Sequence, residues 1–149
     1  MTSKVSQLET SLNDVASKNI KEIVSLMEFF VRETNKSPEF VQVLDEIKSL
    51  RLTVSNVVII SYTSVYFLRF KEDIKRKDVE KLLNFDYTSL IEEDTVSDTD
   101  QLIRRLIDSI KNVWLRGNSK TQNHIKSSIF KMLKYSMIYK NVNDELEKS

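Results

Sequence analysis

The apolar residues of this chain recur mostly at intervals of three and four, the spacing that places side chains on one face of an α-helix. Over residues 1–18 the repeat is narrow, and its apolar positions are Val5, Leu8, Leu12 and Val15. A seam this thin is typical of a coiled coil. After residue 20 the stripe widens, as in a helix packed on a globular core. We therefore expect residues 1–18 to form an extended or partner-packing N-terminal helix, or the first part of a helix on the chain's own core.

A helix boundary follows at residues 35–39. Ser37 is suited to the N-cap, where its hydroxyl accepts an amide hydrogen bond, and Pro38 suits the first helical position, where no amide donor is needed. Beyond Pro38 the helical spacing continues to about Leu68 without a stop signal. The sequence therefore predicts a turn before Pro38 and an uninterrupted helical pattern after it.

The segment from Thr53 to Leu68 is uncharged and rich in β-branched and aromatic residues. Propensity alone favours a strand there. No glycine, proline or Asn-Gly pair separates its two apolar runs, so a hairpin has no turn. A membrane span is a further alternative, although the run is shorter than the ~20 residues that a span needs. We predict a buried central helix over about Thr53–Leu68, with strand and membrane span left open.

Residues 69–85 are dense in charge and predict one or two short surface helices, and residues 86–100 predict an acidic loop. Ser97 and the acids after it then open a helix whose strong apolar stripe ends at Trp114 and whose last turn holds Arg116. Gly117 suits a left-handed cap just past that helix, and Asn118 or Ser119 caps the next one. The fold predicted from these patterns is all-α: one domain over residues 1–149, a bundle of five to seven helices around the central helix.

Composition narrows the function classes. The chain holds one glycine, one proline, one histidine and no cysteine among 149 residues. Glycine-rich phosphate loops and dinucleotide folds need several glycines at fixed spacing, and cysteine zinc sites need cysteine. These classes are therefore excluded.

Charge is unevenly distributed although the net charge is only +1. Residues 101–140 carry a single acid, Asp108, against nine basic residues. This candidate basic face consists of Arg104, Arg105, Lys111, Arg116, Lys120, Lys126, Lys131, Lys134 and Lys140. Three interpretations are open: neutralisation by acids of the same chain, contact with an acidic patch on a neighbouring subunit, or contact with nucleic-acid phosphates.

No catalytic, cofactor-binding or metal-binding residue is predicted. The acidic loop lacks the glycine and the final glutamate of a calcium-binding loop, which leaves only a looser cation site at Glu92, Glu93, Asp94 and Asp98 as an alternative. His124 is expected at the surface, and Trp114 as a core anchor. Paired carboxylates for acid–base chemistry need burial, and the acids here lie in charged surroundings.

These observations predict a non-enzymatic structural or interaction protein that works as a subunit of a homo- or hetero-oligomer. The alternative is a helical protein that binds nucleic acid through the basic 101–140 helices. The richness in lysine, asparagine, isoleucine and serine is typical of AT-rich genomes, so a minor coat or scaffold component of a large DNA virus is the expected context. No apolar signal opens the sequence, which predicts an intracellular, non-secreted protein, with the virion as one location.

Overall fold

A computed structural model describes residues 3–86 and 97–149, and within those ranges every regular element is a helix. The elements are α1 (Lys4–Glu33), α2 (Pro38–Thr53), α3 (Asn56–Arg69), α4 (Lys71–Lys75), α5 (Glu80–Asn84), α6 (Asp98–Arg116) and α7 (Ser119–Glu147). The predicted all-α bundle is therefore confirmed, with the number of described helices at the upper end of the expected range.

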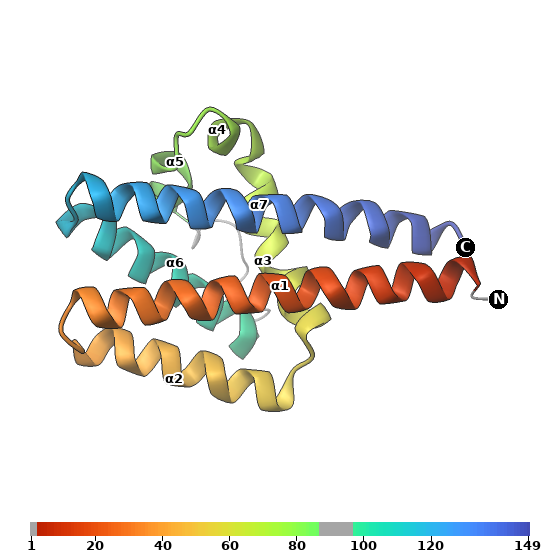
Figure 1. Ribbon diagram of the computed structural model, residues 1–149, viewed down its shortest axis with the longest axis horizontal. Coiled ribbons are helices and arrows are strands. Elements are labelled where there is room, and N and C mark those ends of the chain that lie inside the picture. The colour runs from red at the N-terminus through yellow and green to blue at the C-terminus, as the bar shows by residue number, and fades with distance from the viewer. Residues whose placement is uncertain (1–2, 87–96) are drawn as a thin grey trace.

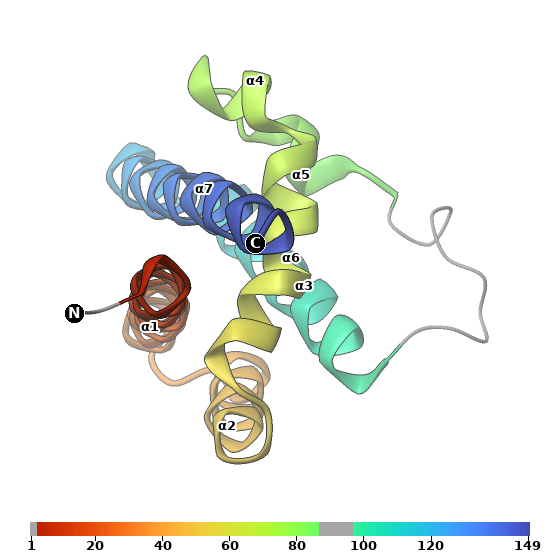
Figure 2. The ribbon, with the colours of Figure 1, turned by 90° about the vertical axis from the view of Figure 1, so that its right-hand side faces the viewer.

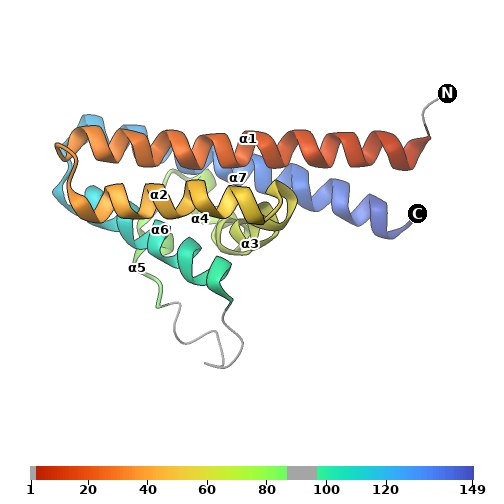
Figure 3. The ribbon, with the colours of Figure 1, turned by 90° about the horizontal axis from the view of Figure 1, so that it is seen from below.

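Two long antiparallel helices, α1 and α7, form the body of the bundle (Figures 1 and 3). α1 is one uninterrupted helix of 30 residues, opened by the Ser3 hydroxyl, which accepts a hydrogen bond from the Ser6 amide at 3.1 Å. α2 and α3 pack against α1, and α3, α4 and α6 pack against α7. Viewed along the long axis, α2 and α4 lie on opposite sides of the α1–α7 pair (Figure 2).

The turn between α1 and α2 is built without glycine. Asn35 and Lys36 both adopt left-handed backbone conformations, with φ of 53° and 62°. Pro38 is the first residue of α2 and Ser37 its N-cap, as predicted, but the Ser37 hydroxyl makes no capping hydrogen bond. The backbone carbonyl of Ser37 accepts from Phe40 and Val41 instead. The predicted cap position is right, and its predicted side-chain bond is wrong.

The prediction of one uninterrupted pattern from Pro38 to Leu68 is also wrong. The backbone of Val54 is extended, and Ser55 starts a new helix by accepting a hydrogen bond from the Val58 amide at 3.2 Å. α3 is the predicted helix, buried along the side that carries Ile59, Ile60 and Phe67. It is not buried all round, because Val65 on its outer side is 62% exposed.

The two short helices α4 and α5 confirm the prediction for residues 69–85. The predicted loop at 86–100 lies largely outside the described residues. α6 begins as predicted, with the Ser97 hydroxyl accepting from the Asp100 amide at 3.1 Å.

Gly117 does not form the predicted left-handed cap, since its φ is −82°. It is required for space instead: an added Cβ would lie 2.8 Å from the Val113 carbonyl oxygen. Asn118 then caps α7 by accepting from the Thr121 amide at 3.0 Å.

The main hydrophobic core draws on every described helix, and Trp114 belongs to it with 9% of its surface exposed. A smaller cluster lies farther along α1, where Val15, Ala16 and Ile60 are buried against Tyr135 and Tyr139 of α7. The buried contact between α1 and α7 therefore continues past the main core, and α3 contributes Ile60 to it.

Candidate functional site

The outer face of α7 beside α4 carries two surface hollows, of about 440 Å³ and 350 Å³. Phe130 lines both hollows and is 49% exposed. Ile74 and Val79 close the first hollow from the α4–α5 side, and Met137 and Ile138 extend the second along α7. We call this surface the α4–α7 groove.

Five lysines line the α4–α7 groove: Lys75, Lys77, Lys126, Lys131 and Lys134. No carboxylate of the described residues lines either hollow. None of the five ammonium groups is in an ion pair with a described residue. The nearby carboxylate of Asp73 is already held by Arg76 and Lys81. The groove is therefore a positively charged surface with an apolar centre.

Lys77 reaches the groove from a strained turn. Its φ is 64°, a left-handed conformation that costs a side-chain-bearing residue roughly 1–2 kcal/mol. The turn is held by the Lys77 amide, which donates to the Ile74 carbonyl at 2.9 Å, and by the Asp78 amide, which donates to the backbone carbonyl of Asp73 at 2.9 Å. Strained backbone of this kind concentrates at functional sites.

The structure divides the predicted basic face into two parts. Four of its members are in ion pairs within the chain: Arg104 with Asp100, Arg105 with Glu46, Arg116 with Glu39, and Lys140 with Asp144. Acids of α2 thus neutralise the two exposed arginines of α6. Lys126, Lys131 and Lys134 gather in the α4–α7 groove, while Lys111 and Lys120 line neither hollow. The nine residues of the candidate basic face therefore lie in different surroundings: four are paired with acids of the same chain, and three line the groove.

The predicted N-terminal seam lies on the side of α1 that carries the core. Val15 is buried, Leu8 and Leu12 are half-buried, and Val5 is 40% exposed. α7 of the same chain runs beside this half of α1 (Figure 1). Packing of the seam on a partner chain stays a prediction.

A buried polar cluster joins α3 to α6. The Tyr66 hydroxyl donates to Asp100 Oδ1 at 2.5 Å, and Arg104 Nε lies 3.2 Å from Asp100 Oδ2. Burial, followed by the hydrogen bond to Asp100, raises the pKa of Tyr66 to about 12. The carboxylate charge is balanced by the Arg104 guanidinium, so the cluster ties the two helices together.

His124 is exposed, as expected, and its ring stacks on Phe29 of α1 with the centroids 3.9 Å apart. Within residues 3–86 and 97–149 no group of three or more histidine, aspartate or glutamate side chains is placed to hold a metal ion. The alternative cation site at residues 92–98 falls mostly outside those ranges. None of the described helices is long and apolar enough to span a membrane.

Sequence reasoning found the α7 lysines of the groove but missed Phe130, Met137 and Ile138. It also missed Lys75 of α4 and Lys77 of the turn that follows α4. The sequence did contain one signal for Phe130, namely its position off the buried stripe of α7. The buried stripe of α7 runs through Ile125, Ile129 and Met132, and Phe130 lies on the other side of the helix. Lys75 and Lys77 could be assigned only once the fold had placed α4 against α7.

The chain was compared with protein-family models, curated proteins and solved structures. No family model, curated protein or solved structure matches it. The groove and its charges therefore carry the functional argument alone.

Proposed function

We propose that this chain is a non-enzymatic interaction protein, a subunit of a larger protein assembly, and that it holds its partner in the α4–α7 groove. The observation that carries the proposal is the exposed Phe130 among five lysines without ion-pair partners in the described chain. An aromatic anchor at the centre of a charged rim is the usual anatomy of a protein-binding surface. A minor coat or scaffold subunit of a large DNA virus is one context for such a protein.

The chemistry of the groove specifies the partner segment. Apolar side chains are needed over Phe130 and Ile138, and carboxylates are needed beside the lysines. An amphipathic helix with acidic flanks meets both requirements, because its side chains at intervals of three and four form one apolar face. The charges steer the encounter, and the apolar contacts supply most of the affinity.

A nucleic-acid partner fits the same surface less well. Duplex recognition needs basic groups that reach phosphates. Four of the nine residues of the predicted basic face are held in ion pairs within the chain, and the lysines of the groove surround an apolar centre. Binding to phosphate alone would leave Phe130 exposed to water.

Fluorescence anisotropy tests the proposal with a labelled amphipathic peptide of leucine and glutamate as the probe. We expect the wild-type chain to bind it and the variant Lys126→Glu/Lys131→Glu/Lys134→Glu to bind at least about tenfold more weakly. A second variant, Phe130→Ala, should also weaken binding while leaving the net charge unchanged. Circular dichroism establishes that both variants are folded.

The matched control is Lys21→Glu/Lys48→Glu/Lys120→Glu, which makes the same change in net charge at exposed lysines outside the groove. Equal loss of peptide binding in the control and the groove variant would contradict the proposal. So would binding of a DNA duplex in preference to the peptide, with affinity falling steeply as salt rises.

A further inference from the structure

Charge is segregated along the outer face of α7. The middle of the helix carries Lys131 and Lys134 in the groove, and its last turns carry Asp144, Glu145 and Glu147. Lys131, Lys134, Ile138, Asn141 and Glu145 follow one another at intervals of three and four, so they share one side of the helix. The basic patch and the carboxylate of Glu145 thus lie on the same exposed side of the helix, with Asp144 on the adjoining side and Glu147 on the opposite side.

The acidic end of α7 projects from the bundle. The N-terminal end of α1 and the C-terminal end of α7 extend together past the ends of α2, α3 and α6, and both chain termini lie at that end (Figures 1 and 3). We call this pair of helix ends, which carries Lys4 of α1 and Asp144, Glu145 and Glu147 of α7, the two-helix arm. Its acids are therefore placed to meet another molecule.

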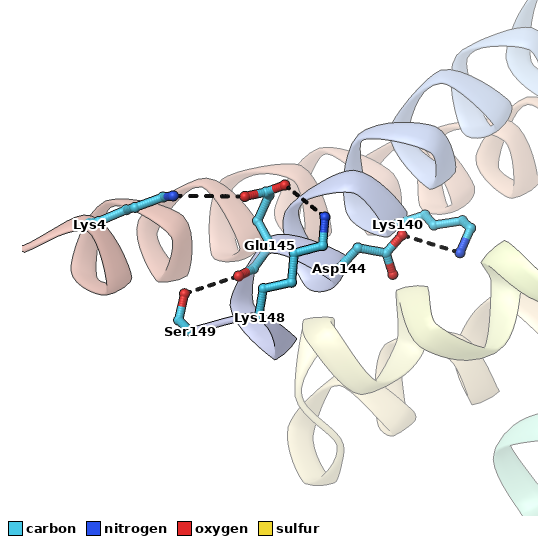
Figure 4. Close-up of polar contacts among 6 residues, drawn as sticks. All are labelled: Lys4, Lys140, Asp144, Glu145, Lys148 and Ser149. Atoms are coloured by element: carbon cyan, nitrogen blue, oxygen red, sulfur yellow. Dashed lines mark hydrogen bonds and ion pairs between the residues drawn. The ribbon is translucent and has the colours of Figure 1, made fainter.

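The carboxylates of the arm are held only loosely within the chain (Figure 4). Glu145 lies 3.8 Å from Lys4 and 3.6 Å from Lys148, and Asp144 lies 3.4 Å from Lys140. The Asp144 and Glu145 side chains are each 46% exposed. Exposed pairs of this kind contribute little, so their exchange for other lysines costs little.

We propose that the segment that fills the α4–α7 groove is the acidic end of α7 from a second copy of this chain. This inference rests on the proposed function and names its partner. Two α7 helices that cross antiparallel place Lys131 and Lys134 of each copy beside Asp144 and Glu145 of the other. The contact is isologous, so both halves form at once and the dimer closes on itself.

The antiparallel crossing accounts for the exposed apolar side chain of Ile138. It lies midway between Lys131 and Glu145 in the helix, so the twofold axis passes beside it. It is 39% exposed in the isolated chain. In the dimer it meets its own symmetry mate, with Phe130 and Met137 to one side, and the apolar centre of the groove is covered.

The overlap from Lys131 to Glu145 spans about 21 Å of helix. One helix pair of this length, with its contacts to α4, lies at the low end of specific interfaces. The dimer therefore depends on protein concentration, and it weakens as salt screens the ion pairs.

Sedimentation equilibrium with charge-reversed variants tests the inference. We expect the wild-type chain to form a salt-sensitive dimer, and both Lys131→Glu/Lys134→Glu and Asp144→Lys/Glu145→Lys to dissociate at least about tenfold more readily. When the two variants are mixed, each acidic groove meets a basic arm and each basic groove meets an acidic arm. The mixture should therefore regain the dimer that neither variant forms alone.

The milder variant Asp144→Asn/Glu145→Gln removes the two negative charges without reversing them, so it disturbs the end of α7 less. It too should weaken the dimer. A wild-type chain that stays monomeric while the acidic peptide binds would overturn the inference and leave the proposed function intact. A dimer that survives both charge reversals, or a mixture that stays monomeric, would also overturn it. If the folded wild-type chain neither dimerises nor binds the peptide, that result would contradict the proposed function as well.

Discussion

Asn19 is fully buried where α1 meets α3, and its Nδ2 donates to Thr63 Oγ1 at 3.2 Å. Its Oδ1 has no hydrogen-bond partner among the described residues. A buried amide of this kind costs desolvation energy and permits only one register of the two helices. The change in apolar pattern after residue 18 marks the position in the sequence, but nothing in the pattern identifies Thr63 as the partner.

Thr63→Val removes the acceptor and leaves the Asn19 amide buried without a partner. The free energy of unfolding should fall by roughly 1–3 kcal/mol, because an unsatisfied buried polar group bears its full desolvation cost. Urea denaturation measures the change. The double variant Asn19→Leu/Thr63→Val should recover most of it, and a double variant less stable than Thr63→Val would contradict this account of the pair.

Tyr66 makes stability depend on pH at alkaline values. Burial and the hydrogen bond to Asp100 raise its pKa to about 12, above the ordinary value of 10.0. The folded chain therefore holds this proton more tightly than the unfolded chain. The stabilisation is complete below pH 10 and is lost as the pH rises towards 12.

Tyr66→Phe should lower the free energy of unfolding by roughly 1–3 kcal/mol at neutral pH, because the Asp100 carboxylate loses its donor. The gap between wild type and variant should narrow between pH 10 and 12, as followed by urea midpoints. The difference between the two proteins isolates the contribution of the Tyr66 hydroxyl. A gap that does not change with pH would contradict the assigned pKa shift.

At the scale of single elements, helix starts were predicted better than helix interruptions. Ser97 and Asn118 cap α6 and α7 as their residue types suggest. The break at Val54 was missed because the apolar spacing runs through it without glycine or proline. Ser55 is the residue that accounts for the break, since its hydroxyl accepts a hydrogen bond from the Val58 amide, one of the amides in the first turn of α3 that have no partner within the helix.

Ser55 and Ser37 both occupy N-cap positions, but only the Ser55 hydroxyl makes a capping hydrogen bond, so the two serines provide a matched test. Ser55→Ala removes a capping hydrogen bond and should lower the free energy of unfolding by about 1 kcal/mol. Ser37→Ala should change it by less than about 0.5 kcal/mol, because the Ser37 hydroxyl caps nothing. Thermal melts of the two variants measure the difference, and equal losses would contradict the assigned roles.

At the scale of the whole molecule, the sequence predicted the all-α class and the excess of basic residues but not their surroundings. Whether Arg105 or Lys131 is neutralised depends on which helix lies beside it. α2 supplies Glu46 to Arg105, whereas the neighbour of Lys131 is α4, which adds further lysines. Such neighbours, more than 50 residues apart in the chain, are set by the packing of the core and not by local pattern.

The same packing gives α7 a basic middle and a projecting acidic end. This arrangement is the basis of the dimer that we propose, in which the basic middle of one α7 helix meets the acidic end of another. The net charge of +1 conceals the charge asymmetry on which that proposal rests.

The central claim is that the outer face of α7 contacts another protein chain. A single cysteine placed at the centre of that face tests it most directly. The chain contains no cysteine, so Ile138→Cys carries the only thiol and any disulfide joins two copies. Disulfides need Cα atoms within about 7 Å, so we expect rapid formation of a disulfide-linked dimer on oxidation, and high salt should slow it. Lys48→Cys, exposed on α2, is the control and should form no disulfide-linked dimer over the same time. Equal and slow cross-linking of the two variants would contradict the contact.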